Sequence, residues 1–193
     1  MKHPLLILLL SFFFFISCKK EKSDPEPSGG TSQTIVPLAQ GNIWNYRRIS
    51  FPQQDTSFYS IWISGDTMIG TEYWFKQNTS QDSSYYIFTK NKQDGFHYYH
   101  QDVGTDDLGY KYPAVPGDNY VATYYIDSIS VQNIDTNITA PAGQFSCYEY
   151  HINEMGFYIY LSYFSPGTGR IKTISYTNGN VSVVSELISY HLE

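Results

Sequence analysis

The residues best suited to covalent chemistry in this chain of 193 residues are its two cysteines, Cys18 and Cys147. Cys18 stands at a sharp change of composition, with an apolar run over residues 5–16 and Ser17 before it. Residues 19–33, which follow it, are rich in Pro, Gly, Ser and charge, and such segments do not build a packed core. A thiolate is a good nucleophile, and at this junction Cys18 is predicted to accept a lipid.

The segment before Cys18 has the parts of an export signal: a basic start at Lys2, an apolar centre and a small residue at the cut. Its apolar run has twelve residues, whereas a membrane-spanning helix needs about 20. Residues 15–18 (Phe-Ile-Ser-Cys) resemble the end of a bacterial lipoprotein signal; an ordinary secretory signal is the alternative. We predict a cleaved signal peptide over residues 1–17, then a lipidated Cys18 and a flexible tether over residues 18–34. Acyl chains such as palmitate would hold the protein on the outer membrane, on its periplasmic or its surface-exposed face.

Cys147 and the histidines do not form an obvious catalytic or metal-binding set. On a strand, His151 would lie roughly 13 Å from Cys147 on the same face, so Cys147 is predicted to be a buried core residue. His97 and His100 fall on opposite faces of a strand and cannot chelate one ion from there. We therefore assign no catalytic residue, no metal ligand and no cofactor.

The acidic residues leave two possibilities open. Asp102, Asp106 and Asp107 gather in a segment over residues 101–109 that also contains two glycines, and oxygen-rich loops of this kind can bind calcium. The spacing matches no EF-hand, however, and Asp and Gly also mark ordinary turns. The chain has neither a Gly-x-Ser-x-Gly nor a His-Glu-x-x-His motif, but a hydrolytic pair of carboxylates stays possible.

The charge of residues 35–193 excludes some partners. This part carries 15 acidic and 8 basic side chains, a net charge of −7. Nucleic-acid affinity comes mostly from Lys and Arg contacts to phosphates, so we expect no nucleic-acid partner. The same balance disfavours an electrostatic attraction to anionic lipid in addition to the anchor.

The composition from residue 35 onward is that of β-strands, with frequent Tyr, Phe, Thr, Ile and Val and turn residues at short intervals. We predict one all-β domain over residues 35–193, an antiparallel meander of about 10–12 strands in a barrel-like or half-barrel curved sheet. At most short helical turns are expected, one of them over Pro37–Gln40. The strands are predicted at residues 43–51, 58–64, 67–69, 72–77, 84–90, 96–101, 119–126, 128–138, 144–153, 157–164, 169–177 and 181–192, with a polar loop after residue 101.

Four segments of this domain resemble a group of uncharacterised outer-membrane lipoproteins from Bacteroidetes-type bacteria. They are residues 36–46, with Gly-Asn-x-Trp-x-Tyr; Pro116-Gly117-Asp118; residues 141–148, with Pro-Ala-Gly-x-Phe-x-Cys; and residues 163–172, with Pro-Gly-x-Gly-x-x-Lys. The likeness covers most of the domain and implies a structural role for these motifs, without an activity to transfer. The expected architecture is also similar to the half-barrels of periplasmic lipoprotein carriers, as a fold-level analogy.

Three functions follow from these observations. The first is a membrane-anchored envelope lipoprotein that acts as a non-catalytic binding or structural module. The alternative is a carrier that holds a hydrophobic ligand in a half-barrel cavity, and the second alternative is a hydrolase with a carboxylate-based site. The expected partners are the membrane, through the lipid on Cys18, and an envelope protein, glycan or lipid ligand; the ligand-binding residues stay unassigned.

Overall fold

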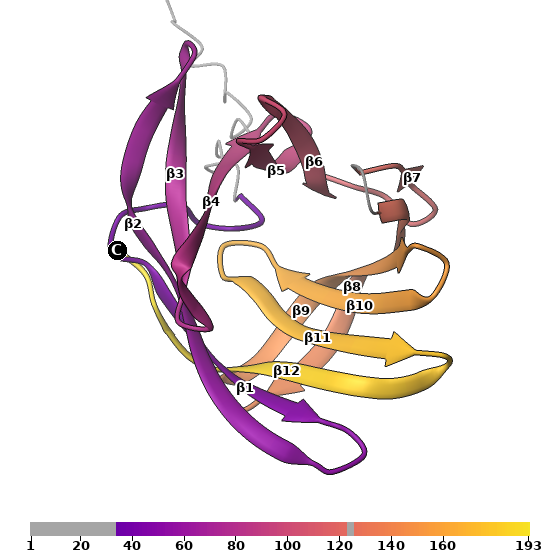
Figure 1. The fold of residues 1–193 in the computed structure, drawn as a ribbon. Coiled ribbons are helices and arrows are strands. Elements are labelled where there is room, and N and C mark those ends of the chain that lie inside the picture. The colour runs from indigo at the N-terminus through magenta and orange to yellow at the C-terminus, as the bar shows by residue number, and fades with distance from the viewer. Residues whose placement is uncertain (1–33, 123–125) are drawn as a thin grey trace, which may run out of the picture. The chain divides into compact units, whose positions relative to one another are not determined.

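The computed structural model describes residues 34–122 and 126–193, in which the regular elements are β-strands (Figure 1). The predicted signal peptide, Cys18 and the tether before Thr34 lie outside these ranges. Within them, no helix is long and apolar enough to cross a membrane. The strands are β1 (Ile43–Ser50), β2 (Asp55–Ile69), β3 (Glu72–Thr79), β4 (Asp82–Lys92), β5 (Gly95–His100), β6 (Thr105–Lys111), β7 (Asn119–Tyr120), β8 (Ile126–Ala140), β9 (Gly143–Glu154), β10 (Tyr158–Ser165), β11 (Gly169–Thr177) and β12 (Asn180–His191).

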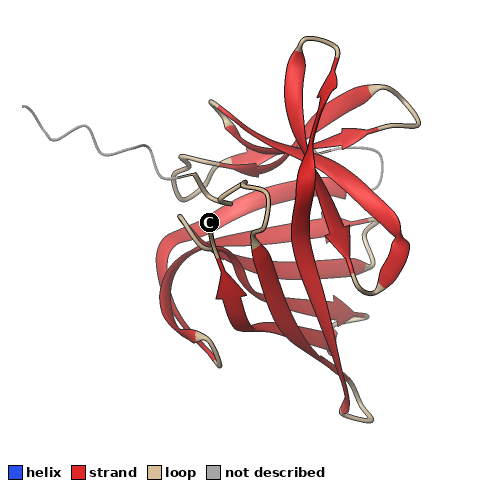
Figure 2. Cartoon of the chain, turned by 90° about the vertical axis from the view of Figure 1, so that its left-hand side faces the viewer, coloured by secondary structure: helices blue, strands red, loops and turns tan. Residues whose placement is uncertain are grey.

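These strands form a single antiparallel sheet made of two meanders (Figure 2). One meander runs from β1 outward to β6, and the other runs from β7 at the opposite edge back to β12. The two meet where β1 pairs with β12, from Ile43 opposite His191 to Ser50 opposite Val183. The prediction of an all-β antiparallel fold with 10–12 strands is thus confirmed.

The short connection between the two edges of the sheet requires the sheet to bend. Twelve strands laid flat would place β6 and β7 roughly 53 Å apart at about 4.8 Å per strand. The connection over residues 112–118 can span at most about 28 Å. The bend brings the ring of Tyr110 in β6 to 4.1 Å from that of Phe164 in β10, measured between ring centroids. The sheet nevertheless stays open, because β6 and β7 do not pair with each other.

Aromatic rings from both meanders fill the inside of this bend. The Tyr110 and Tyr150 rings lie 5.1 Å apart, and Tyr150 is fully buried. The hydroxyl of Tyr150 donates to the carbonyl of Lys111 at 2.7 Å. Tyrosine suits such a core because its ring can be buried while its hydroxyl finds a backbone partner. This helps to explain why the chain contains 19 tyrosines.

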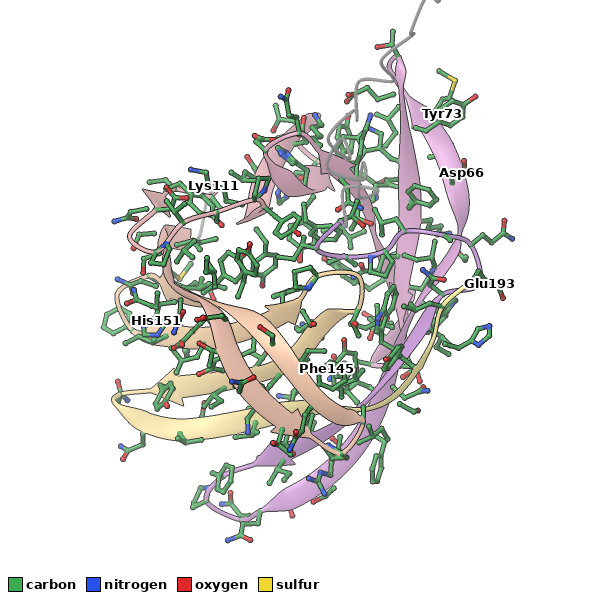
Figure 3. The ribbon with its side chains drawn as sticks, turned by 180° about the vertical axis from the view of Figure 1, so that it is seen from behind. Asp66, Tyr73, Lys111, Phe145, His151 and Glu193 are labelled. Carbon is green, nitrogen blue, oxygen red and sulfur yellow. The ribbon has the colours of Figure 1, made fainter. Side chains whose placement is uncertain are left out.

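The tip of the β8–β9 hairpin reaches across to β12. Ala142 at this tip donates its backbone N–H to the carbonyl of Leu187 at 3.1 Å. Phe145 of β9 also packs near Tyr190 of β12, with ring centroids 6.3 Å apart. Seen from behind, β8 and β9 cross the other C-terminal strands (Figure 3). This crossing supplies a second set of tertiary contacts within the C-terminal meander.

Three local predictions were wrong. The segment predicted as a polar loop contains β6. In this strand the Tyr98 ring packs directly on Gly109, and a Cβ at that position would collide with the ring. The two strands predicted on either side of Gly65 are one strand, β2, whose register shifts at a bulge between Ile63 and Gly65. The helical turn predicted over Pro37–Gln40 is absent, since a turn closes there by a hydrogen bond from Asn42 N to Ala39 O at 3.2 Å.

Candidate functional site

Two of the four segments that carried the sequence resemblance, residues 36–46 and 163–172, meet in space. Trp44 Nε1 donates to the carbonyl of Thr168 at 2.6 Å, and the Tyr46 hydroxyl donates to the carbonyl of Arg170 at 2.9 Å. The backbone N–H of Gly167 bonds the carbonyl of Thr34 at 2.8 Å. The Gly-Asn-x-Trp-x-Tyr start therefore docks on the Pro-Gly-x-Gly turn, and both motifs hold the sheet together.

Asn42 fixes the segment before β1. It is fully buried, and its Nδ2 donates to the carbonyl of Pro37 at 3.1 Å. Its Oδ1 accepts the backbone N–H of Glu193 at 2.8 Å. One asparagine side chain thus satisfies backbone groups at both ends of the described domain.

The inside of the bend is not completely filled. An apolar hollow of about 310 Å³ opens beside β5 and β6, and its volume lies at the lower end of the range of small-molecule sites. His100 and Asp107 also line it. Rings and aliphatic groups dominate the remaining wall, which includes Tyr85, Ile87, Tyr98, Tyr110, Ile129 and Ile152.

A second hollow, of about 330 Å³, adjoins the first and is more polar. The two share Tyr110 and Ile152 in their walls. The polar hollow is lined by two cations and several hydroxyls, among them Arg48, Arg170, Ser162, Thr173, Ser175 and Ser185. An apolar space and a cationic, hydroxyl-lined space therefore lie next to each other inside the bend.

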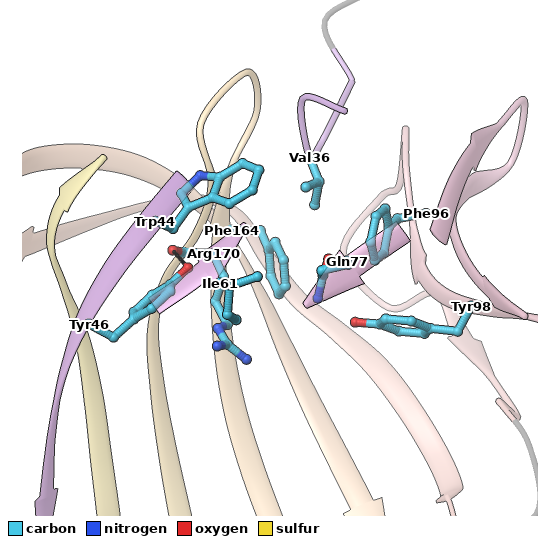
Figure 4. Close-up of a pocket in the computed structure, with 9 residues that line it drawn as sticks. All are labelled: Val36, Trp44, Tyr46, Ile61, Gln77, Phe96, Tyr98, Phe164 and Arg170. Atoms are coloured by element: carbon cyan, nitrogen blue, oxygen red, sulfur yellow. Dashed lines mark hydrogen bonds between the residues drawn. The ribbon is translucent and has the colours of Figure 1, made fainter. Parts of the chain in front are cut away.

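Arg170 occupies the boundary between the polar hollow and a small cavity of about 40 Å³ (Figure 4). Its Nη2 donates to the Tyr59 hydroxyl at 3.1 Å, and its Cζ lies 4.9 Å from the centroid of the Tyr46 ring. Burial raises the pKa of Tyr46 to about 12, although the neighbouring Arg170 acts in the opposite direction. The phenol is therefore neutral at physiological pH and leaves the guanidinium charge uncompensated.

The two histidines predicted on opposite faces of a strand have separate carboxylate partners. His97 is buried, with Nδ1 2.8 Å from Asp106 Oδ2 and Nε2 2.9 Å from Asp94 Oδ1. His100 Nε2 lies 2.7 Å from Asp107 Oδ2, beside the apolar hollow. The two imidazoles thus belong to different clusters.

The three aspartates considered for calcium do not converge. Asp102 is exposed in the turn before β6, whereas Asp106 and Asp107 follow each other within that strand, so they point to opposite faces. Burial alone would raise the pKa of Asp106, but hydrogen bonds from Lys92 and His97 outweigh it and hold this pKa below its ordinary value. Among the described residues, no group of three or more His, Cys, Asp or Glu side chains has metal-binding geometry.

Cys147 is fully buried in β9, as the sequence predicted. Burial raises the pKa of its thiol to about 12, so it is protonated and poorly nucleophilic at neutral pH. His151, also in β9, contacts Glu149 at 3.0 Å. Cys18, the predicted lipid site, lies outside the described residues.

Sequence reasoning did not identify Arg48 and Arg170 as lining residues. A usable signal was their rarity, because the chain has three arginines in all. Arg170 also follows directly after the Pro-Gly-Thr-Gly turn that was singled out. What could not be read from the sequence is that β1 and β11 flank β12 in the sheet, which places both arginines in the wall of one hollow.

Comparisons with known proteins support the fold. No family model matches the chain, and no curated protein matches it. The fold is similar to that of a Bacteroides fragilis NCTC 9343 protein, provisionally named as an exported protein with a YmcC-like fold. The TM-score is 0.55 at 13% identity, and the match covers 83% of this chain and 100% of that one. It is also similar to that of a protein from Parabacteroides distasonis ATCC 8503, provisionally named as a lipoprotein, with a TM-score of 0.52 at 13% identity, covering 82% of this chain and 99% of that one.

Proposed function

We propose that the chain is a lipoprotein of the bacterial cell envelope, anchored to the outer membrane through Cys18, whose sheet domain is a non-catalytic binding module. The position of Cys18 between an export signal and a polar tether supports the anchor. The names of the two structurally similar proteins, an exported protein and a lipoprotein, support the location.

The observation that carries the binding role is the apolar hollow inside the bent sheet. Its wall combines the rings of Tyr85, Tyr98 and Tyr110 with the aliphatic groups of Ile129 and Ile152. Such a wall gains free energy by removing an apolar ligand from water. A ligand with a hydrocarbon or ring portion fits this lining, which favours the carrier of a hydrophobic ligand as the specific form of the module.

The hydrolase alternative has weaker support. His100 and Asp107 form a close pair beside the hollow, but a triad also needs a nucleophile bonded to the imidazole. Within residues 34–122 and 126–193, no Ser, Thr or Cys side chain donates a hydrogen bond to His100. Asp106 and Asp107 do not provide a convergent carboxylate pair either.

The anchor is tested by Cys18→Ala in a bacterial host that lipidates exported proteins. We expect the variant to move from the membrane to the soluble fraction and to lose incorporation of a palmitate analogue. Cys147→Ala is the matched control and should stay membrane-bound and labelled, because its thiol is buried. A Cys18→Ala protein that remains in washed membranes would refute the lipid anchor.

The orientation is tested by adding protease to intact cells. A domain on the periplasmic face would be protected until the outer membrane is permeabilised, whereas a surface-exposed domain would be cut at once. Either result is compatible with an outer-membrane anchor, and detection of the protein only in inner-membrane fractions would contradict it.

A further inference from the structure

The distribution of cations within the domain is uneven. Eight Lys and Arg residues lie between residues 34 and 193. Five of them contact a carboxylate within 4 Å: Arg47, Lys90, Lys92, Lys111 and Lys172. The other three have no such partner among the described residues, and two of these three, Arg48 and Arg170, line the same polar hollow.

The guanidinium of Arg170 has donors to spare. A guanidinium carries five N–H donors, and Tyr59 accepts one side-chain hydrogen bond from it. Thr173, in the wall of the same hollow, has a buried Oγ1 without a hydrogen-bond partner in the described part of the chain. Ser162 and Ser185 add hydroxyls to that wall. The hollow thus offers several donors that a ligand with anionic oxygens would satisfy.

Arg170 is half-buried, and keeping a partly desolvated cation without a counter-charge costs free energy. Removing a cation from water destabilises a protein unless an opposite charge or several hydrogen bonds compensate. Glu154 also lines the hollow, at the end away from Arg170. Its carboxylate is hydrogen-bonded to Tyr160 of β10. Arg170 pairs with Phe164, four residues further along that strand. That is roughly 13 Å along the strand, too far for a direct ion pair.

We propose that the polar hollow binds an anionic oxygen group, a carboxylate or a phosphate, on the guanidinium of Arg170, with Arg48 adding positive charge. Arginine is suited to this because its planar donors match two oxygens of a carboxylate or phosphate. The site rests on the proposed binding function and deepens it. Because the polar hollow adjoins the apolar one through Tyr110 and Ile152, the ligand would be an amphiphile with its anionic end at Arg170.

The test is an NMR titration of the full-length protein in nonionic detergent, read at the arginine Nε–Hε signals, which number three at most. The probes are inorganic phosphate, acetate, hexanoate and the neutral 1-hexanol. We expect the anions to shift the Arg170 signal saturably and the Arg47 signal to stay in place. In ligand-observed titrations, Arg170→Met should weaken hexanoate binding roughly tenfold or more, while 1-hexanol binds as before. Arg47→Met is the matched control, because Arg47 is already paired with Glu186. It should change neither the binding of hexanoate nor that of 1-hexanol.

The outcomes separate the site from the proposed function. Hexanoate binding more tightly than acetate would identify an amphiphile, whereas phosphate and acetate binding as tightly as hexanoate would identify a free anion. Either result supports the site if Arg170→Met abolishes the preference for anions over 1-hexanol. Equal binding of hexanoate and 1-hexanol would overturn the anion site and leave the apolar binding role intact. No binding of any probe would overturn both. If Arg170→Met does not fold, the comparison of hexanoate with 1-hexanol on the unmodified protein still decides, and Arg170→Lys, which keeps the charge, should retain part of the preference.

Discussion

At the scale of single residues, Trp44 joins two parts of the chain that are 124 positions apart. Its ring is 2% exposed, and its Nε1 reaches the carbonyl of Thr168. Gly169, which follows Thr168 in the turn, has a φ of +99°, a backbone conformation that favours glycine. The position therefore uses the donor of tryptophan as well as the bulk of its ring.

The replacement Trp44→Phe removes this donor and keeps an aromatic ring. We expect the free energy of unfolding to fall by about 1–3 kcal/mol, because the part-buried carbonyl of Thr168 loses its partner, with a further loss from the smaller ring. Urea denaturation followed by circular dichroism measures the change. Trp62→Phe is the control, since Trp62 is half-buried and its indole donates no hydrogen bond within the described residues. Equal losses in the two variants would show that the indole donor is unimportant.

At the scale of elements, Glu186 links the three strands at the centre of the sheet. Its carboxylate, on β12, contacts Arg47 of β1 and Lys172 of β11, each at 2.8 Å. Burial raises the pKa of Glu186, but hydrogen bonds from Lys172 and Arg47 outweigh this and lower the pKa below its ordinary value of 4.5. The bridge spans the junction at which the two meanders pair.

The replacement Glu186→Gln should lower the free energy of unfolding at pH 7 by about 1–3 kcal/mol. A carboxylate whose pKa is lowered in the folded state stabilises that state at pH values above the pKa that it has in the unfolded chain. This contribution is lost as the pH falls through the pKa of the folded state. The difference in the free energy of unfolding between wild type and variant should therefore shrink below about pH 4.5. Glu72→Gln, at a more exposed bridge to Lys90 and Lys92, should have a clearly smaller effect. A gap that is the same at pH 7 and pH 3.5 would contradict the assignment.

The elements also show what the sequence could predict. The strands β9 to β12 were placed to within one or two residues, because their turns carry residues with positive φ, such as Asn178 and Gly179. The strand β6 was missed because its Asp and Gly residues are typical of loops, and its role depends on the Tyr98 ring that covers Gly109. The lining of the two hollows depends on the bend, a non-local property that periodicity does not encode.

At the scale of the whole molecule, the domain is acidic, with 15 acidic and 8 basic side chains after residue 33. We expect full-length Cys18→Ala protein to sediment no more with phosphatidylglycerol vesicles than with phosphatidylcholine vesicles at low salt, because anionic headgroups would repel it. Arg48 and Arg170, the two arginines without a carboxylate partner among the described residues, line the polar hollow. Salt-sensitive binding to the anionic vesicles alone would show that the domain has a second, electrostatic membrane contact.

The pairing of β1 with β12 has a consequence for folding kinetics. Each meander can grow by adding neighbouring hairpins, but the contact between the meanders joins strands from opposite ends of the described chain. Closing so long a loop is entropically costly, and such contacts slow folding. Until β12 has been synthesised and has paired with β1, one edge of β1 stays unpaired and is a template for association with other chains. That interval is when the protein is most prone to aggregate.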